Sequence, residues 1–167
     1  MKDKLKILIM IVLGIILGIF SKYSDTSGKT FSHYFGIISS GIVFWYCIAT
    51  LILYLSKTRK KFNLHYISFM SSMLLSYYLY SKYIIDYYNS KIIWFWIIML
   101  LITTIIGNLF YNIRKTNIFK KLFITGSIVL IIYDGITLNS FKNGTFIIDI
   151  ILSIAVYKII NKKFIIE

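Results

Sequence analysis

Two aspartates inside apolar stretches are the side chains best suited to chemistry. The sequence has six acidic residues, and Asp134 and Asp149 are the two that fall within long hydrophobic runs. An ionisable side chain at the middle of a membrane helix costs roughly 2.5–3.5 kcal/mol on insertion scales, so it is a functional-site candidate by default. Two close carboxylates cannot both ionise cheaply. This pair therefore suits cation binding, proton relay or aspartyl-type hydrolysis.

The position of the two aspartates places them at one depth. Asp134 lies near the end of a predicted helix over 122–138, and Asp149 lies near the start of the next, over 145–160. At about 1.5 Å per residue, each lies on the order of 6 Å below the outer boundary of a hairpin. A structural role is the alternative. Either acid could reach the outer interface, pair with Lys142, or accept a hydrogen bond from a neighbouring Tyr, Thr or Asn.

Other reactive groups do not cluster. Cys47 is the single cysteine, so neither an intramolecular disulfide nor a thiol metal cluster is expected. His33 and His65 begin predicted helices on opposite sides of a membrane, roughly 30 Å apart. No nucleophile elbow, phosphate loop or zinc motif occurs. The sequence therefore predicts no metal site, no cofactor and no catalytic residue, and it favours a non-enzymatic protein.

Composition indicates a membrane protein. Hydrophobic residues make up 58% of the chain and charged residues 15%, against about 25% charged residues in a typical globular protein. The net charge of +13 does not indicate nucleic-acid binding, because the basic residues form short clusters between apolar runs. Contact with the lipid bilayer and its anionic headgroups explains them. We expect one all-α integral membrane domain over residues 1–167.

Six apolar runs have lengths near the 17–25 residues that a membrane helix needs. They cover residues 7–20, 35–55, 64–83, 92–111, 122–138 and 145–160. The first run follows three lysines, as in a signal peptide, but no small-x-small site follows it, so we expect an uncleaved helix. Proline is absent, which favours straight helices, although glycine can also break a helix.

The basic residues predict the orientation. With six helices, fourteen of the 19 lysines and arginines fall on one side, and short basic segments mark the cytoplasmic side. These are Lys2, Lys4, Lys6, Lys57, Arg59, Lys60, Lys61, Arg114, Lys115, Lys120, Lys121, Lys158, Lys162 and Lys163; the others are Lys22, Lys29, Lys82, Lys91 and Lys142. We therefore expect a multi-pass protein of the plasma membrane, with both termini in the cytoplasm.

Small residues and aromatic residues each allow two interpretations. Small side chains at helical spacing let helices approach closely, either within the chain or against another membrane protein; they are Gly14, Gly18, Gly36, Ser40, Ser68, Ser72 and Ser76. Aromatic side chains near the second outer connector indicate an interfacial belt or a stacking site for a flat or cationic ligand; they are Tyr77, Tyr78, Tyr80, Tyr83, Tyr87, Tyr88, Trp94, Phe95 and Trp96.

Two segments carry a family resemblance. Residues 13–25 (LGIILGIFSKYSD) and 76–81 (SYYLYS) resemble small uncharacterised multipass membrane proteins of low-GC Gram-positive bacteria, over the first half of the chain. That resemblance implies no known chemistry. Size, helix count and orientation are similar to the substrate-binding subunits of energy-coupling-factor vitamin transporters, although Gly14-xxx-Gly18 replaces their Ala-x-x-x-Ala contact motif. This likeness implies a small-molecule or ion transport component with an energising ATPase as partner.

Two further classes remain to be weighed. Gly107-Asn108-Leu109-Phe110-Tyr111 resembles the Gly-Asn-x-x-Asp segment of lipoprotein signal peptidases, but Tyr111 stands at the acid's position and the segment lies at the cytoplasmic end. An intramembrane hydrolase is therefore the less favoured reading. An interaction or immunity-type membrane protein is the main alternative to a transport component.

Overall fold

The structure is a computed structural model, and it describes residues 2–26, 30–86 and 90–162. These ranges are helical and contain no strand, as the sequence predicts. The helices are α1 (Lys2–Thr26), α2 (Thr30–Ser40), α3 (Ile42–Leu55), α4 (Arg59–Tyr83), α5 (Ser90–Phe110), a 3₁₀ turn η1 (Tyr111–Ile113), α6 (Asn117–Thr137), α7 (Ser140–Asn143) and α8 (Phe146–Lys162). Lys29, Tyr87, Tyr88 and Lys163 lie outside the described residues.

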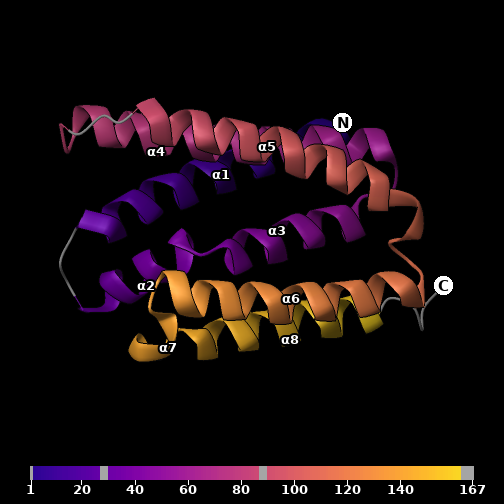
Figure 1. The fold of residues 1–167 in the computed structure, drawn as a ribbon. Helices are drawn as coiled ribbons and strands as arrows, with labels where there is room; N and C mark the ends of the chain where they lie inside the picture. Colours follow the sequence, from indigo (N-terminus) through magenta and orange to yellow (C-terminus); the bar gives the residue numbers. More distant parts are fainter. Residues whose placement is uncertain (1, 27–29, 87–89, 163–167) are drawn as a thin grey trace.

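The helices form a layered bundle (Figure 1). Helices α1, α4 and α5 form one side, α6 and α8 form the other, and α2 and α3 lie between them. The chain runs back and forth along the bundle, so α1 begins and α8 ends at the same end. The connectors from α3 to α4 and from α5 to α6 lie at that end too. We call it the basic end, because the lysine- and arginine-rich connectors lie there.

Polar contacts join the helices at the basic end. The Lys61 ammonium forms a salt bridge of 2.9 Å with Asp3, which joins α4 to α1. The Lys120 ammonium donates to the side chain of Asn161 at 2.9 Å, which joins α6 to α8. The exposed Lys61–Asp3 pair adds little stability. It shows that the first turns of α1 and α4 lie together at the basic end.

Arg114 is a buried cation in this region. Its guanidinium donates to the backbone carbonyls of Tyr111 at 2.6 Å and Ser56 at 3.2 Å. It also lies 3.6 Å from the centre of the Tyr111 ring. Arginine suits such a site because its planar group can stack and donate several hydrogen bonds at once. Arg114 thus holds η1 against the end of α3.

Helices α1 and α4 meet through small residues. A Cβ atom at Gly14 would clash with the side chain of Ser72 and the backbone carbonyl of Phe69, and one at Gly18 would clash with Ser76 and the carbonyl of Met73. The two glycines therefore let the backbones of α1 and α4 approach closely within one chain.

The other small residues that the sequence marks have different surroundings. A Cβ at Gly36 would lie 3.1 Å from the backbone carbonyl oxygen of Ser24, which places α2 close against α1. Ser68 is half-buried, one turn before Ser72 on α4. Ser40 is exposed at the end of α2.

The second apolar run is not the straight helix expected from the absence of proline. It divides at Gly41 into α2 and α3, which are bent by 65°. Gly41 has an extended backbone, with φ −74° and ψ 149°. The backbone N–H of Val43, in the first turn of α3, donates to the Asp134 carboxylate of α6 at 3.0 Å. A long-range helix cap, rather than proline, therefore accounts for the break.

Two of the described helices are long and apolar enough to cross a membrane. These are the stretches Asp3–Thr26 of α1 and Ile93–Ile113, which includes most of α5, with mean hydropathies of 2.3 and 2.2. The bent pair α2 and α3 would be a third span if it crosses as one unit. Among the described helices, α4, α6 and α8 do not meet the same criterion. The protein is thus all-helical with two to three candidate spans out of the six expected.

Candidate functional site

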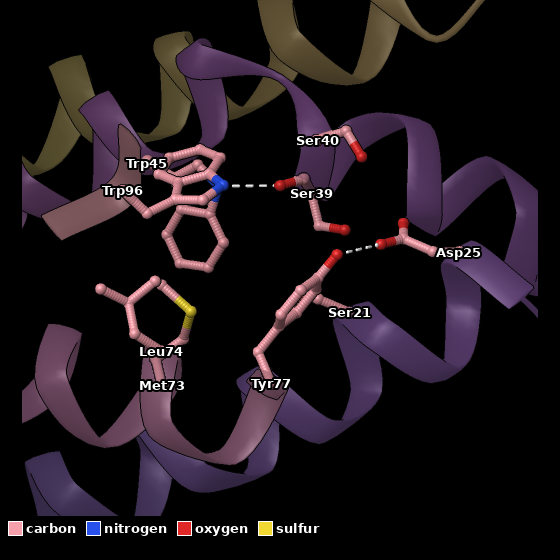
Figure 2. A pocket seen from close by; sticks show the side chains of 9 residues that line it. All are labelled: Ser21, Asp25, Ser39, Ser40, Trp45, Met73, Leu74, Tyr77 and Trp96. Atoms are coloured by element: carbon pink, nitrogen blue, oxygen red, sulfur yellow. Dashed lines mark hydrogen bonds between the residues drawn. The ribbon is translucent and has the colours of Figure 1, made fainter. Parts of the chain in front are cut away.

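A cavity of about 220 Å³ lies at the end of the bundle opposite the basic end. Figure 2 shows that its side chains come from five helices, α1 to α5. The lining residues are Ser21, Asp25, Ser39, Ser40, Trp45, Met73, Leu74, Tyr77 and Trp96. The cavity therefore brings together an acid, three serines and three aromatic side chains that are far apart in the sequence.

The acid is held in place by an aromatic side chain. The Tyr77 hydroxyl donates to the Asp25 carboxylate at 2.9 Å (Figure 2). The buried Lys22 ammonium lies 5.1 Å from the centre of the Tyr77 ring. Both a negative and a positive group thus lie around Tyr77. Asp25 was not singled out from the sequence, because it follows an apolar run instead of interrupting one.

The indoles and serines complete the cavity. The Trp45 ring nitrogen donates to the backbone carbonyl of Ser39 at 2.7 Å, which fixes the orientation of the ring (Figure 2). The Ser21 hydroxyl is buried and has no hydrogen-bond partner in the structure. A buried polar atom without a partner is uncommon and is destabilising by roughly 1–3 kcal/mol. Ser21 is therefore available to a bound molecule.

The aromatic cluster of the sequence divides between two environments. Tyr77 and Trp96 line the cavity, whereas Trp94 and Tyr83 are exposed large side chains at the same end of the bundle. The first pair suits stacking of a ligand, and the second pair suits a membrane interface. The two predictions for the cluster therefore concern different residues.

Asp134 and Asp149 are buried on facing helices. Asp134 is 2% exposed, and one of its oxygens accepts the hydrogen bond from Val43 described above. Asp149 on α8 is 4% exposed, and its Oδ1 has no hydrogen-bond partner. Among the described residues, neither aspartate forms an ion pair, with Lys142 or any other cation. Neither lines the cavity beside Asp25 or either of the two apolar cavities described below.

Helix register places the two aspartates at one level. Helices α3 and α8 run in the same direction (Figure 1), and Cys47 Sγ of α3 lies 3.8 Å from Ser153 Oγ of α8. Val43 and Asp149 each lie one turn before these residues, at i−4. Asp149 therefore lies level with the start of α3, where the Asp134 carboxylate binds.

Two further cavities are apolar. One of about 360 Å³ lies between α3, α4, α5 and α6, with walls of aromatic and aliphatic side chains such as Phe62, Met99 and Phe123. Its Tyr66 hydroxyl already donates to Thr103 at 2.7 Å. The other, of about 480 Å³, is formed by side chains of α1 and α4 and by Ile84. Neither holds the convergent polar groups that give a ligand site its specificity.

His, Cys, Asp and Glu side chains do not cluster in the described part of the chain. No group of three or more His, Cys, Asp or Glu side chains there could hold a metal ion. His33 and His65 lie on α2 and α4. Comparisons with family models, curated proteins and solved structures found no match for this chain. What the protein does is therefore inferred from its own geometry.

Proposed function

We propose that this chain is a six-span protein of the cytoplasmic membrane that binds a small, flat, nitrogen-containing molecule, as the binding component of a transport system. One observation carries the proposal. The Asp25 carboxylate, two indole rings and the unpartnered Ser21 hydroxyl line a single cavity. A few converging polar groups among aromatic walls are typical of small-molecule sites.

The arrangement of the connectors supports six spans with both ends inside. The basic connectors and both ends of the described chain lie at one end of the bundle (Figure 1), as an even number of passes requires. Short basic segments favour the cytoplasmic side. Helix α8 has 17 residues, and α4 and α6 carry more polar and charged side chains along their length. Each of the three packs against neighbouring helices. Protein contacts then shield their polar groups from lipid.

The surface of α5 also supports a membrane location. Only 6% of its most apolar stretch is buried in the bundle, and Leu101, Ile105 and Leu109 are among its exposed side chains. Soluble monomers rarely expose apolar patches of this extent. Acyl chains of the bilayer would cover this face.

The charges around Tyr77 favour a particular class of ligand. The Asp25 carboxylate accepts hydrogen bonds, and the nearby Lys22 ammonium limits the net negative charge of the site. A ligand with ring N–H donors can use both the carboxylate and the indole faces. The cavity volume lies below the roughly 300–1,000 Å³ of sites for drug-sized ligands. The ligand is thus a small metabolite with an aromatic nitrogen ring.

The proposed orientation assigns a role to each end. The cavity lies at the outer end and receives its ligand from outside the cell. The basic end faces the cytoplasm and contacts anionic headgroups, and an energising ATPase would dock there. The exposed face of α5 favours the second candidate function, an interaction or immunity-type protein that uses this face to bind another membrane protein.

Ligand binding by the purified protein in nanodiscs tests the proposal. Two of the three tryptophans line the cavity, so tryptophan fluorescence reports its occupancy. We would titrate nicotinamide and adenine as flat nitrogen probes and cyclohexylamine as a non-aromatic control. The proposal predicts a saturable change with at least one flat probe, and about tenfold weaker binding in Asp25→Asn.

Asp86→Asn is the matched control, because Asp86 is an exposed acid at the same end of the bundle. Its affinity for the probe should stay within a factor of two of the wild type. Equal affinities of the wild type and Asp25→Asn would contradict the proposal. So would unchanged fluorescence with both flat probes.

A further inference from the structure

Three buried polar atoms without hydrogen-bond partners belong to the α6–α8 hairpin. They are Asp149 Oδ1, Ser140 Oγ and Thr145 Oγ1. Their residues are 4%, 2% and 2% exposed, respectively. Each such atom lacks the water contacts that it has in the unfolded chain. Three in one hairpin indicate a shared ligand rather than three separate packing defects.

The backbone brings these atoms to one corner of the bundle. Thr145 and Asp149 lie one turn apart, and the Asp149 N–H donates to the Thr145 carbonyl at 3.4 Å. Thr145 immediately precedes α8 and Asp149 lies in its first turn, so both lie at the buried N-terminal end of that helix. Ser140 begins the short α7, which is held between Asn139 and Gly144, both with left-handed backbones. This compact connector keeps Ser140 beside the end of α6 that carries Asp134.

The same corner has an excess of negative charge. Asp134 and Asp149 lie level with each other, and no basic side chain among the described residues forms an ion pair with either. The N-terminus of α3 supplies a positive dipole of about half a charge, which faces Asp134. This dipole offsets only part of two carboxylates. A buried charge without a counter-ion is strongly unfavourable.

We propose that Asp134, Asp149, Ser140 and Thr145 form a sodium-ion site beneath the break between α2 and α3. All the available groups are carboxylate or hydroxyl oxygens, which are ligands for hard cations. Ca²⁺ takes about six to eight oxygen ligands, and Mg²⁺ retains several waters. A monovalent ion suits the smaller oxygen set of this corner. Cys47 does not compete as a ligand, since its sulfur contacts Ser153.

The sodium site and the Asp25 cavity share the α2–α3 break. Ser39, Ser40 and Trp45 line the cavity on either side of Gly41, and Asp134 binds the first turn of α3. A sodium ion at this corner would hold the bend that shapes the cavity. The site itself does not depend on the proposed ligand, because its atoms lie outside the cavity lining.

Thermal unfolding of the full chain in nanodiscs tests the sodium site. Choline chloride would be replaced by sodium chloride at constant ionic strength and pH 8. We expect the unfolding temperature to rise saturably, by about 5 °C once sodium exceeds its dissociation constant a hundredfold. Asp149→Asn should abolish this rise. Because it removes a buried charge, it should also unfold at a higher temperature than the wild type in choline chloride.

Two more variants keep the test decisive. Thr145→Val preserves the size of the side chain and both acids, and it should weaken sodium binding about tenfold. Asp86→Asn, at an exposed acid, should respond as the wild type does. An equal sodium response in Asp149→Asn would overturn the proposal. A wild type that responds to pH but not to sodium would also overturn it, because the aspartates would then share a proton.

Discussion

The Asp134 carboxylate of α6 caps the N-terminus of α3 by accepting a hydrogen bond from the Val43 backbone N–H, at 3.0 Å and 91 residues away in the sequence. This contact satisfies a backbone donor that the break after α2 would leave without a partner. It also fixes α6 against the bend. Asp134 therefore has a structural role, whether or not a cation binds beside it.

Removing this cap should destabilise the bundle. Asp134→Ala loses the acceptor, and caps of this kind contribute about 0.5–2 kcal/mol. Asp134→Asn keeps an acceptor oxygen and should lose less stability. Urea unfolding in mild detergent compares the two variants in an Asp149→Asn background, where repulsion between the two buried carboxylates no longer contributes. Equal stability of Asp134→Ala and its Asp149→Asn parent would contradict the assignment of Asp134 as the cap.

Gly41→Ala should act through the same contact. A Cβ atom at Gly41 would lie 2.8 Å from an oxygen of Asp134, so the carboxylate must move away from Val43. We expect a loss of about 1–3 kcal/mol, as for overpacking elsewhere. The double variant Gly41→Ala/Asp134→Ala should lose less stability than the sum of the losses in the two single variants. Additive losses would show that the two residues act independently.

Gly18→Ala should weaken the contact between α1 and α4. A Cβ at Gly18 would clash with both the Ser76 side chain and the Met73 backbone carbonyl. Ser76→Ala removes only the first of these clashes and should not restore stability. Ile16→Ala is the control, since Ile16 is exposed on the same helix. Full rescue of Gly18→Ala by Ser76→Ala would contradict the observed backbone approach.

Arg114→Lys should destabilise the basic end. Lysine cannot stack on Tyr111 while also reaching the Tyr111 and Ser56 carbonyls. Hydrogen bonds to charged groups contribute about 1.5–3 kcal/mol, and we expect a loss in that range by urea unfolding. Lys121→Arg, at an exposed position, should change stability by less than about 0.5 kcal/mol. A neutral Arg114→Lys would show that charge alone suffices.

The helical segments were predictable because they depend on local hydrophobic patterns. Each of the six apolar runs corresponds to α1, to the α2–α3 pair, or to one of α4, α5, α6 and α8. The break at Gly41 was not predictable. The side chain that caps the helix start after the break is Asp134, which comes from a distant part of the sequence. Proline and glycine counts carry no information about such a long-range cap.

The candidate sites were predictable only in part. Asp134 and Asp149 stand out because they interrupt apolar runs, but the sequence does not show that Ser140 and Thr145 lie beside them without hydrogen-bond partners. Asp25 ends an apolar run and resembles an interfacial residue. Its meeting with Tyr77 depends on the packing of α1 against α4, which only the three-dimensional structure shows.

Site-directed cysteine labelling tests most directly whether the basic end faces the cytoplasm and the opposite end of the bundle faces the outside. In a Cys47→Ser background, which leaves no other cysteine, single cysteines would replace Lys60 in the first turn of α4 and Asn143 at the end of α7. Both positions are exposed, and a membrane-impermeant maleimide would be added to intact cells. With the basic end in the cytoplasm, residue 143 should be labelled in intact cells and residue 60 only after lysis. Labelling of both residues from the same side would contradict it.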